Sequence, residues 1–231
     1  MGRSGGFTVE SAIIEAGLIP LFYQPDPAIV IDAVAACVAG GARAVEFTDR
    51  GPGAYRVFAS AVEALRQQST PAILGVGSIV DPATAALYIA NGASFVVGPY
   101  FRPDVAALCL RRGVPYIPGA ATPWEIGQAE EHGATIVKVF PARLLKPQFI
   151  SDVLGPSPHS RLVPTGGVPA TRDGVSAWIK AGAAAVGIGS QLVPSHPTRA
   201  SDLNSLAKRV AEALLWIAES RSEVGQTQAV R

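Results

Sequence analysis

The segment Ala134-Thr-Ile-Val-Lys-Val-Phe-Pro141 has the composition of a short buried β-strand. β-branched residues predominate from Thr135 to Val139, with Gly133 before them and Pro141 after them, as in strands that end at turns. Lys138 lies in the middle of this strand. Because an ammonium group is costly to bury, Lys138 either extends to water from a strand end or faces a cavity.

The second possibility has chemical consequences. Burial disfavours the charged form of an amine. A neutral amine is the nucleophile that forms a Schiff base with a keto group. The strands and helices on either side of Lys138 therefore decide between the two interpretations.

Short apolar strands alternate with amphipathic helical segments along the whole chain. We expect strands at 18–23, 43–48, 72–76, 94–97, 114–117, 135–139, 161–164 and 184–188. We expect helices at 11–16, 28–39, 54–67, 82–90, 103–112, 123–132, 147–154, 172–181 and 201–219. Asp81-Pro82 and Thr122-Pro123 have the residues that start helices. Eight strand–helix units without strong alternation in the strands predict an α/β fold, a (β/α)8 TIM barrel with a leading N-terminal helix. A doubly wound open sheet is the alternative.

A single domain accounts for the whole chain of 231 residues. Single α/β barrels commonly have about this length, and no linker-like change of composition interrupts the pattern. We expect the barrel core to span about residues 8–219. We expect the polar tail at 220–231 to be frayed.

The composition restricts the partners and the compartment. Hydrophobic residues make up 48% of the chain and charged residues 16%, with a formal net charge of +1. Neither a nucleic-acid partner nor a membrane is predicted, and residues 1–6 lack the apolar core of a signal peptide. We therefore expect a cytoplasmic protein in which Cys37 and Cys109 are buried free thiols. No metal and no cofactor is predicted, because the histidines and cysteines lack metal-ligand spacing.

Polar residues of the second and sixth predicted strands form the candidate site, because barrel active sites lie at the C-terminal ends of the strands. Glu46 shares one face of its strand with Ala44 and Thr48, and a carboxylate there is rare unless it is paired or functional. A salt bridge to a helix or to Lys138 is the structural alternative. If both groups face inward, Glu46 can move protons while the Lys138 amine attacks a carbonyl. Arg50 is placed to bind a substrate carboxylate.

Glycine-rich segments follow three further strands. Gly75-Val-Gly-Ser78 offers backbone N–H groups and a hydroxyl, although such turns are common. Pro164-Thr-Gly-Gly-Val168 and Gly187-Ile-Gly-Ser190 follow the predicted seventh and eighth strands. Barrels frequently bind phosphate in these two loops through glycine N–H groups. Their joint position predicts a phosphate site.

With these residues in place, the chain resembles the 2-keto-3-deoxy-6-phosphogluconate (KDPG) aldolase family, which includes the 4-hydroxy-2-oxoglutarate (KHG) aldolases. The likeness extends from about residue 19 to about residue 193. It rests on the ordered set Gly40-Gly-Ala-Arg-Ala-Val-Glu-Phe-Thr-Asp-Arg50, Gly75-Val-Gly-Ser-Ile-Val-Asp-Pro82, Pro118-Gly119, Lys138-Val-Phe-Pro-Ala142, Pro164-Thr-Gly-Gly-Val168 and Gly187-Ile-Gly-Ser190.

The resemblance implies a metal-independent class I aldolase that forms a homotrimer. Its expected reaction is reversible cleavage of KDPG, or of a close 4-hydroxy-2-oxo acid, to pyruvate and either glyceraldehyde 3-phosphate or glyoxylate. Lys138 matches the Schiff-base lysine and Glu46 the general acid/base. The substrate-binding positions match Arg50 and Ser78 for the carboxylate, Pro99 and Phe140 for the pyruvate pocket, and Thr165, Gly166, Gly167, Gly189 and Ser190 for the phosphate end.

Several positions differ from the residues usual in that family. Ser78 replaces a threonine, and Asp49 replaces an apolar residue beside Arg50. Tyr23-Gln24 stands where many members have a basic residue, and 98–102 is bulkier and more basic than usual. We expect the same chemistry, with an acceptor aldehyde that the sequence leaves open.

Two other functions fit the same residues. A phosphosugar isomerase or epimerase would use Glu46 as a base and Lys138 as an electrostatic partner, without a covalent intermediate. A non-catalytic phosphate-ligand-binding protein would keep the pair for stability alone, so that loss of either partner would destabilise the fold. Trapping of an imine with pyruvate distinguishes an aldolase from both.

Overall fold

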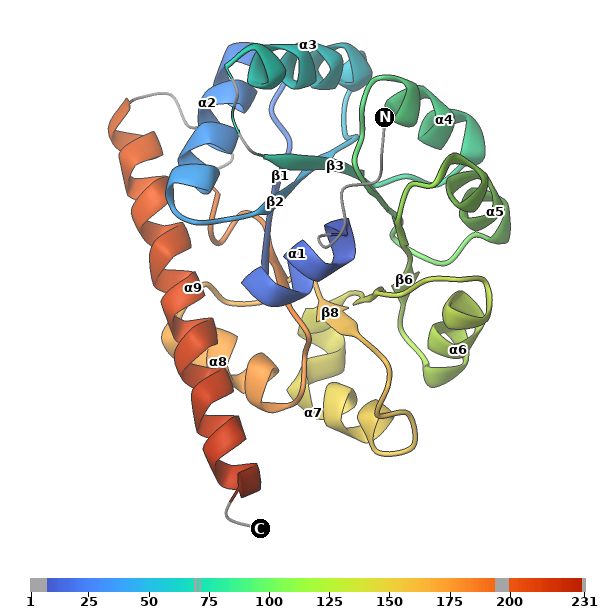
Figure 1. Cartoon of the computed structure of the whole chain (residues 1–231), viewed down its shortest axis with the longest axis vertical. Helices are drawn as coiled ribbons and strands as arrows, with labels where there is room; N and C mark the ends of the chain where they lie inside the picture. Colours follow the sequence, from blue (N-terminus) through green and yellow to red (C-terminus); the bar gives the residue numbers. More distant parts are fainter. Residues whose placement is uncertain (1–7, 69, 71, 194–199, 230–231) are drawn as a thin grey trace.

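The computed structural model describes residues 8–68, 70, 72–193 and 200–229, in which a barrel of parallel strands is surrounded by helices (Figure 1). The strands are β1 (Leu18–Phe22), β2 (Ala44–Thr48), β3 (Ile73–Gly77), β4 (Val96–Val97), β5 (Tyr116–Ile117), β6 (Gly119–Ala120), β7 (Val137–Val139), β8 (Leu162–Pro164) and β9 (Val186–Ile188). One sheet has the order β5-β4-β3-β2-β1-β9 and the other the order β6-β7-β8.

The two sheets are parts of one barrel. β5 and β6 follow each other with only Pro118 between them, because proline has no N–H to donate to a neighbouring strand. A parallel bridge between Thr165 and Gly187 joins the end of β8 to β9. With β5 and β6 counted as one position, the described residues supply eight barrel positions in chain order. The predicted (β/α)8 fold is confirmed, and its fifth position, predicted as one strand at 114–117, consists of β5 and of β6, which lies beyond the predicted range.

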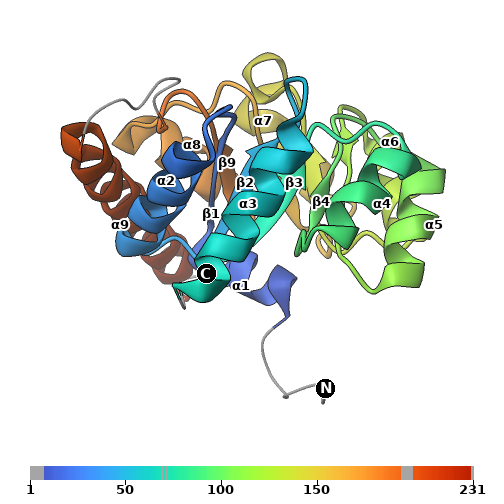
Figure 2. The same cartoon turned by 90° about the horizontal axis from the view of Figure 1, so that it is seen from above.

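Helices cover the outside of the barrel. They are α1 (Val9–Ala16), α2 (Pro27–Ala39), α3 (Ala54–Gln67), α4 (Pro82–Ala90), α5 (Pro103–Arg112), α6 (Pro123–Glu131), α7 (Ala142–Leu154), α8 (Arg172–Lys180) and α9 (Ala200–Ala229). The leading helix α1 lies across one end of the barrel (Figures 1 and 2), whereas α9 packs along α2 and α8. No helix within the described ranges is long and apolar enough to cross a membrane.

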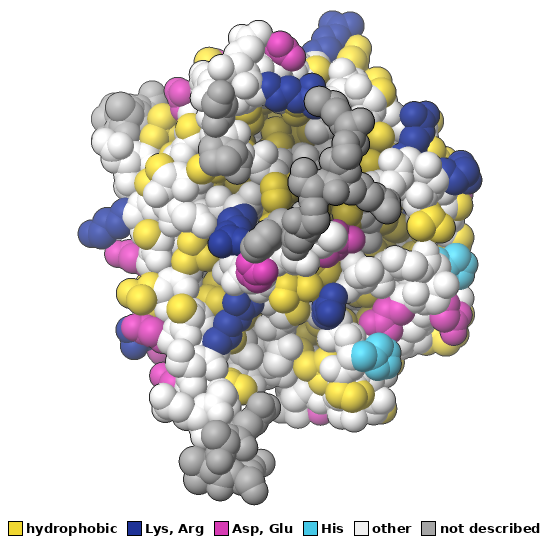
Figure 3. All heavy atoms as spheres, viewed as in Figure 1, with side chains coloured by type: hydrophobic (Ala, Val, Ile, Leu, Met, Phe, Trp, Pro, Cys, Tyr) yellow, Lys and Arg dark blue, Asp and Glu magenta, His cyan; other side chains and the backbone are white. Residues whose placement is uncertain are grey.

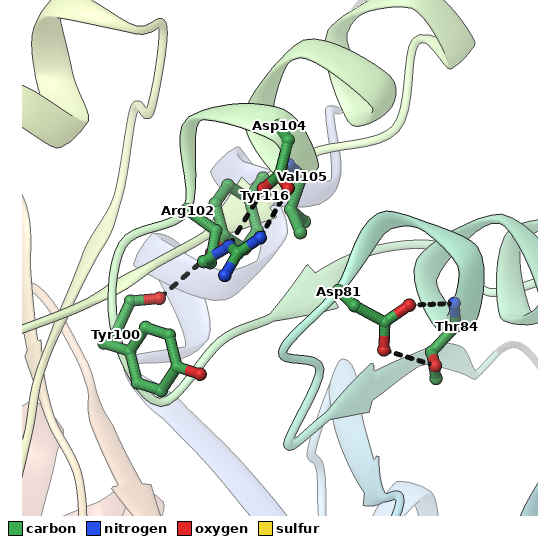
Figure 4. Close-up of polar contacts among 7 residues, drawn as sticks. All are labelled: Asp81, Thr84, Tyr100, Arg102, Asp104, Val105 and Tyr116. Carbon is green, nitrogen blue, oxygen red and sulfur yellow. Dashed lines mark hydrogen bonds and ion pairs between the residues drawn. The ribbon is translucent and has the colours of Figure 1, made fainter.

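The helix-start signals in the sequence act as expected. The Asp81 carboxylate accepts a hydrogen bond from the Thr84 N–H at 2.8 Å and another from the Thr84 hydroxyl, which fixes the start of α4 (Figure 4). In the next loop the Arg102 side chain donates to the Asp104 carboxylate at 3.0 Å, and the Tyr116 hydroxyl donates to the Tyr100 carbonyl (Figure 4). These bonds hold the loops that follow β3 and β4.

Helix α7 begins five residues earlier than the predicted start at 147. It spans Ala142–Leu154 with a kink at Lys146, whose φ of 62° is not helical. The kink precedes Pro147, and proline disfavours a helical conformation in the residue before it. The sequence pattern therefore showed only the second part of the helix.

The prediction of a frayed tail was wrong for the residues that are described. α9 continues to Ala229, and Ser220 is buried, with its hydroxyl bonded to Ser176 and to the Trp216 carbonyl. Arg221 donates hydrogen bonds to the backbone of α1. The first two polar residues of the segment thus bond to α8 and α1.

Two apolar clusters form the core. The larger lies between the strands and the helices and contains both buried cysteines, Cys37 and Cys109, which are free thiols as predicted. The smaller combines side chains from around the barrel with Ile13 of α1 and fills the barrel interior. On the face that α1 covers, acidic and basic side chains are interspersed (Figure 3), in keeping with the low net charge.

Candidate active site

Alternation along the strands decides which side chains enter the barrel. The interior cluster contains Ile19, Ala44, Phe95, Ile117, Ile136, Val163 and Ala185, whereas Val45 and Val137 belong to the outer cluster. Because strand side chains alternate with a period of two, the residues two positions further along also face inward. These are Leu21, Glu46, Val97, Gly119, Lys138, Thr165 and Gly187.

Lys138 lies inside the barrel on β7. Its side chain shares the inward face with Gly119 and Val163, its partners in register on the two neighbouring strands. The residue is only 7% exposed, so it is not a lysine that extends to water. The Lys138 Nζ atom lies 5.0 Å from the centre of the Phe140 ring. The amine is thus held in a partly aromatic pocket.

Glu46 enters the same interior from β2 and is 3% exposed. A Cβ atom on Gly77 would lie 1.7 Å from the Glu46 Oε1 atom, which places the carboxylate directly over that glycine. Burial raises the pKa of Glu46, and the positive charges of Lys138 and Arg50 partly offset this increase. The ion pairs found among the described residues include neither Glu46 nor Lys138. The two groups interact through their charges without a direct salt bridge.

Glycines provide the space that these side chains need. A Cβ atom on Gly75 would lie 2.4 Å from the Phe95 ring, and one on Gly119 would lie 2.1 Å from the Pro99 carbonyl oxygen. Larger residues at these positions would collide with the ring and with the backbone after β4. Gly77 is needed in the same way by Glu46.

Arg50 and Ser78 lie in the loops that follow β2 and β3. Arg50 is exposed at the barrel mouth, and its charge acts on Glu46. Ser78 is half-buried and has a φ of 66°. A left-handed conformation is uncommon for a residue other than glycine and is most unfavourable for a β-branched one. Serine therefore suits this backbone better than threonine would, since both carry a hydroxyl but only threonine is β-branched.

The predicted phosphate end adjoins the pocket around Lys138. Gly166 and Gly167 have φ angles of 86° and 96°, which favour glycine. A Cβ atom on Gly166 would lie 2.8 Å from the Phe140 ring, so the loop packs directly on this ring. The Thr165 side chain is buried beside Gly187, where a Cβ atom would lie 2.3 Å from its hydroxyl oxygen.

The segment after β9 completes this end of the site. The Gly189 carbonyl accepts hydrogen bonds from Leu192 and Val193 at 2.8 and 2.9 Å, which forms a tight turn around the exposed Ser190. The fold therefore brings together the ends of β8 and β9, which are the predicted seventh and eighth strands.

Asp49 interacts with a tyrosine on α4. Tyr88 is buried, and its hydroxyl makes no hydrogen bond of good geometry within the described chain. Burial and the Asp49 carboxylate raise the pKa of Tyr88. We assign this contact to charge rather than to a well-formed hydrogen bond. Tyr23 raises the pKa of Tyr88 in the same direction.

Sequence reasoning missed two polar residues of this region. Thr48 appeared only as a small neighbour of Glu46, and its buried hydroxyl is visible only in the structure. Arg143 begins α7 and lies beside Gly167. Because the segment before residue 147 was not predicted to be helical, no sequence signal connected this arginine to the glycine pair.

Two hollows of about 460 and 590 Å³ lie at the opposite end of the barrel. Both are lined by Thr8 and Val9 at the start of α1 and by residues that precede strands. Neither contains a predicted site residue. The predicted site residues lie instead where the strands end.

Comparison with known proteins gives a consistent result. The family model described as "KDPG and KHG aldolase" matches residues 9–209. A 2-dehydro-3-deoxy-phosphogluconate aldolase of Treponema pallidum is 38% identical over 162 residues, which cover 70% of this chain and 75% of that protein. The KHG/KDPG aldolase of Escherichia coli K12 is 28% identical over 210 residues, covering 90% of this chain and 95% of that protein.

A solved structure shares the fold. The KDPG aldolase of Legionella pneumophila, with pyruvate captured as a covalent carbinolamine intermediate, matches with a TM-score of 0.78. The match covers 88% of this chain and 96% of that chain, at 21% identity. At this identity the match supports the barrel architecture and not the individual side chains.

Proposed function

Because the chain belongs to the KDPG and KHG aldolase family, and is thus a class I aldolase that forms pyruvate and an aldehyde, we propose KDPG or a close 4-hydroxy-2-oxo acid as its substrate. The aldehyde product is then glyceraldehyde 3-phosphate or glyoxylate. One observation carries the proposal: the Lys138 amine and the Glu46 carboxylate are both buried on the inward face of the barrel. Burial of both groups near a barrel mouth is typical of a catalytic pair.

In the proposed mechanism the Lys138 amine is the nucleophile that attacks the C2 carbonyl of the substrate. The carbinolamine loses water and becomes a protonated imine. The C4 hydroxyl then loses a proton, the C3–C4 bond breaks, and its electron pair moves to C3 to give an enamine and the free aldehyde. Protonation at C3 and hydrolysis release pyruvate and the amine.

Glu46 is the proposed proton carrier. Burial raises the pKa of this carboxyl group, which makes its carboxylate a stronger base than an exposed glutamate. The charges of Lys138 and Arg50 limit this increase. Glu46 can therefore accept a proton in one step and return it in another.

The remaining residues are proposed to hold the two ends of the substrate. Arg50 and Ser78 bind the carboxylate next to the keto group through charge-assisted and hydroxyl hydrogen bonds, and Pro99 and Phe140 contact the pyruvate carbons. A phosphate, where present, is bound by the loops after β8 and β9: Thr165, Gly166, Gly167, Gly189 and Ser190. Left-handed glycines at this place expose the backbone N–H groups that such a site needs.

Assembly as a homotrimer in the cytoplasm completes the proposal. Most of the exposed large apolar side chains of the described residues lie between the end of β3 and α7: Val80, Leu87, Tyr100, Leu110, Trp124 and Leu144, with Leu215 of α9 as the exception. Such side chains support a protein–protein interface. The free thiols Cys37 and Cys109 suit a reducing compartment. Light scattering of the purified protein tests the trimer, and a monomeric mass would contradict it.

Borohydride reduction in the presence of pyruvate tests the central step. The reagent should reduce the imine to a stable adduct of lactyl size, located on Lys138 by intact mass and peptide mapping. The exposed Lys146 provides an internal control that should stay unmodified. A folded protein without an adduct would contradict the mechanism and favour a barrel isomerase or epimerase.

A further inference from the structure

Thr48 ends β2 with a hydroxyl group that has no hydrogen-bond partner among the described residues. The residue is only 1% exposed. Buried hydroxyl groups in folded proteins are nearly always hydrogen-bonded, because an unpaired one is costly. A small molecule that enters the site would supply the missing hydrogen-bond partner of this hydroxyl.

The position of Thr48 indicates what that molecule does. Thr48 lies four residues after Ala44 of the interior cluster on the same strand. Because strand side chains alternate with a period of two, its side chain also faces into the barrel. In register it is opposite Gly77, the glycine over which the Glu46 carboxylate lies. The hydroxyl and the carboxylate thus share one side of the same strand pair.

We infer that the Thr48 hydroxyl holds the water molecule through which Glu46 exchanges protons with the bound substrate. A water between a hydroxyl and a carboxylate can donate to one and accept from the other. When a methyl C–H bond of the pyruvate imine breaks, its electron pair forms the enamine double bond. The proton passes to the water, which gives one of its own protons to the carboxylate. Thr48 is a positioning residue in this step.

This inference rests on the roles proposed for Lys138 and Glu46. Its experiment compares Thr48→Val, which keeps the shape and removes the hydroxyl, with Thr48→Ser, which keeps the hydroxyl. Exchange of the pyruvate methyl hydrogens in D2O should slow by about tenfold or more in Thr48→Val, the effect of losing one hydrogen bond. Thr48→Ser should stay within about threefold of the wild type.

Three further measurements separate the possible outcomes. The yield of the borohydride adduct on Lys138 should be unchanged in Thr48→Val, because imine formation does not need the hydroxyl. The double variant with Glu46→Gln should exchange no more slowly than Glu46→Gln alone, as residues of one proton path are not additive. Thermal unfolding should show an intact fold. Wild-type exchange in a folded Thr48→Val would overturn the inference, whereas absence of the adduct in the wild type would overturn the proposed function.

A separate observation concerns Arg143 in the first turn of α7. Its side chain runs along Gly167, where a Cβ atom would lie 2.6, 3.3 and 3.4 Å from the Arg143 Cβ, Cγ and Cδ atoms. The Arg143 N–H donates to the Gly166 carbonyl at 3.0 Å. The side chain is exposed, and no ion pair found in the described chain includes it. The Arg143 side chain thus starts beside the glycine pair and carries a guanidinium group without an ion-pair partner among the described residues.

The geometry points to Arg143 as the residue that favours phosphorylated over unphosphorylated substrates. A guanidinium group is always charged and can bind two phosphate oxygens at once. The backbone hydrogen bond to Gly166 fixes the start of α7 against the loop, so the Arg143 side chain leaves the backbone beside the glycine pair. This selectivity rests on the phosphate loop proposed above.

The test compares two substrates, KDPG and the unphosphorylated 4-hydroxy-2-oxoglutarate. Arg143→Gln should lower kcat/KM for KDPG by about 10- to 100-fold, mainly through KM, and change it less than about twofold for the other substrate. Arg111→Gln, at an exposed arginine at the end of α5, is the matched control and should alter neither. An equal effect on both substrates, or none, would overturn the role of Arg143. No preference for KDPG in the wild type would overturn the phosphate loop itself.

Discussion

The two ends of the barrel use the same strands for opposite purposes. At the end that α1 covers, the inward residues are apolar, and Ile13, Ala44 and Ile136 pack in one cluster. Two residues further along the same strands, the inward positions are Glu46 and Lys138. A single alternation of side chains thus produces a packed end and a reactive end.

The two ends differ in whether their residues stabilise the fold or carry the chemistry. The apolar end stabilises the fold by burying hydrophobic surface, whereas the reactive end contains buried ionisable groups that cost stability. Glycines such as Gly75 and Gly77 replace packing atoms there with space. Substitutions at the two ends should therefore have different effects. Those at the reactive end should remove activity while the protein stays folded. Those at the apolar end should lower stability and leave the activity of the folded protein unchanged.

The largest effect is expected from Lys138→Met. Methionine fills a similar volume but cannot form an imine, so turnover should fall by more than about 10⁴-fold, the scale seen when a covalent nucleophile is removed. Stability should be maintained, because an apolar side chain replaces a buried amine. Steady-state assays and urea unfolding measure the two quantities. Lys146→Met, at an exposed lysine, is the control, and measurable activity in Lys138→Met would contradict the assignment.

Glu46→Gln should have the next largest effect. Loss of the proton carrier should slow exchange of the pyruvate methyl hydrogens by about 10²- to 10⁴-fold. Mass spectrometry or NMR in D2O measures this rate. An unchanged rate would remove Glu46 from the mechanism.

The same variant makes a prediction about pH and stability. Because the folded-state pKa of Glu46 is raised, the folded state binds the proton more tightly than the unfolded state. Wild-type stability therefore decreases as pH rises from the unfolded value of about 4.3 through the raised folded value. Glutamine does not titrate, so the stability of Glu46→Gln relative to wild type should increase over this window. Urea unfolding at several pH values measures it, and a difference independent of pH would be incompatible with the raised pKa.

The comparison also shows what the sequence alone predicts. The β-branched segments and helix-start signals such as Asp81-Pro82 were sufficient for the order of strands and helices, because these signals are local. The division of the fifth strand at Pro118 and the early start of α7 at Ala142 depend on how segments meet in space. The polar residues of α9 beyond Glu219 gave no sign that Arg221 bonds to α1, for the same reason.

The sequence singled out candidate site residues where the residue type was itself unusual. A carboxylate at Glu46 and an amine at Lys138 stand out in apolar strands, and the structure buries both. Thr48 and Arg143 did not stand out, because a threonine in a strand and an arginine in a loop are ordinary. Their interest comes from an unpaired hydroxyl and from contact with Gly167, which only the fold reveals.

Ile13→Ala should affect the other end of the barrel. Ile13 is fully buried in the interior cluster, so the change should lower the free energy of unfolding by about 2–5 kcal/mol. Below the unfolding transition, kcat/KM should stay at the wild-type value. Leu215→Ala, at a residue 54% exposed on α9, should change stability by less than about 0.5 kcal/mol. A loss of activity in folded Ile13→Ala would show that the two ends are coupled.

Arg221→Ala should have the smallest effect, and it tests how α1 is held in place. The guanidinium group donates to the carbonyls of Ile14 and Ala184 at 2.7 Å and of Glu15 at 2.8 Å. It thus satisfies two of the last carbonyl groups of α1, which have no partner within the helix. The loss should cost about 1–3 kcal/mol in the free energy of unfolding. Arg221→Lys should recover only part of it, since an ammonium group lacks the planar fork. Denaturant unfolding measures both variants, while kcat/KM should remain unchanged; equal stability of Arg221→Ala and wild type would mean that water replaces all three bonds without cost.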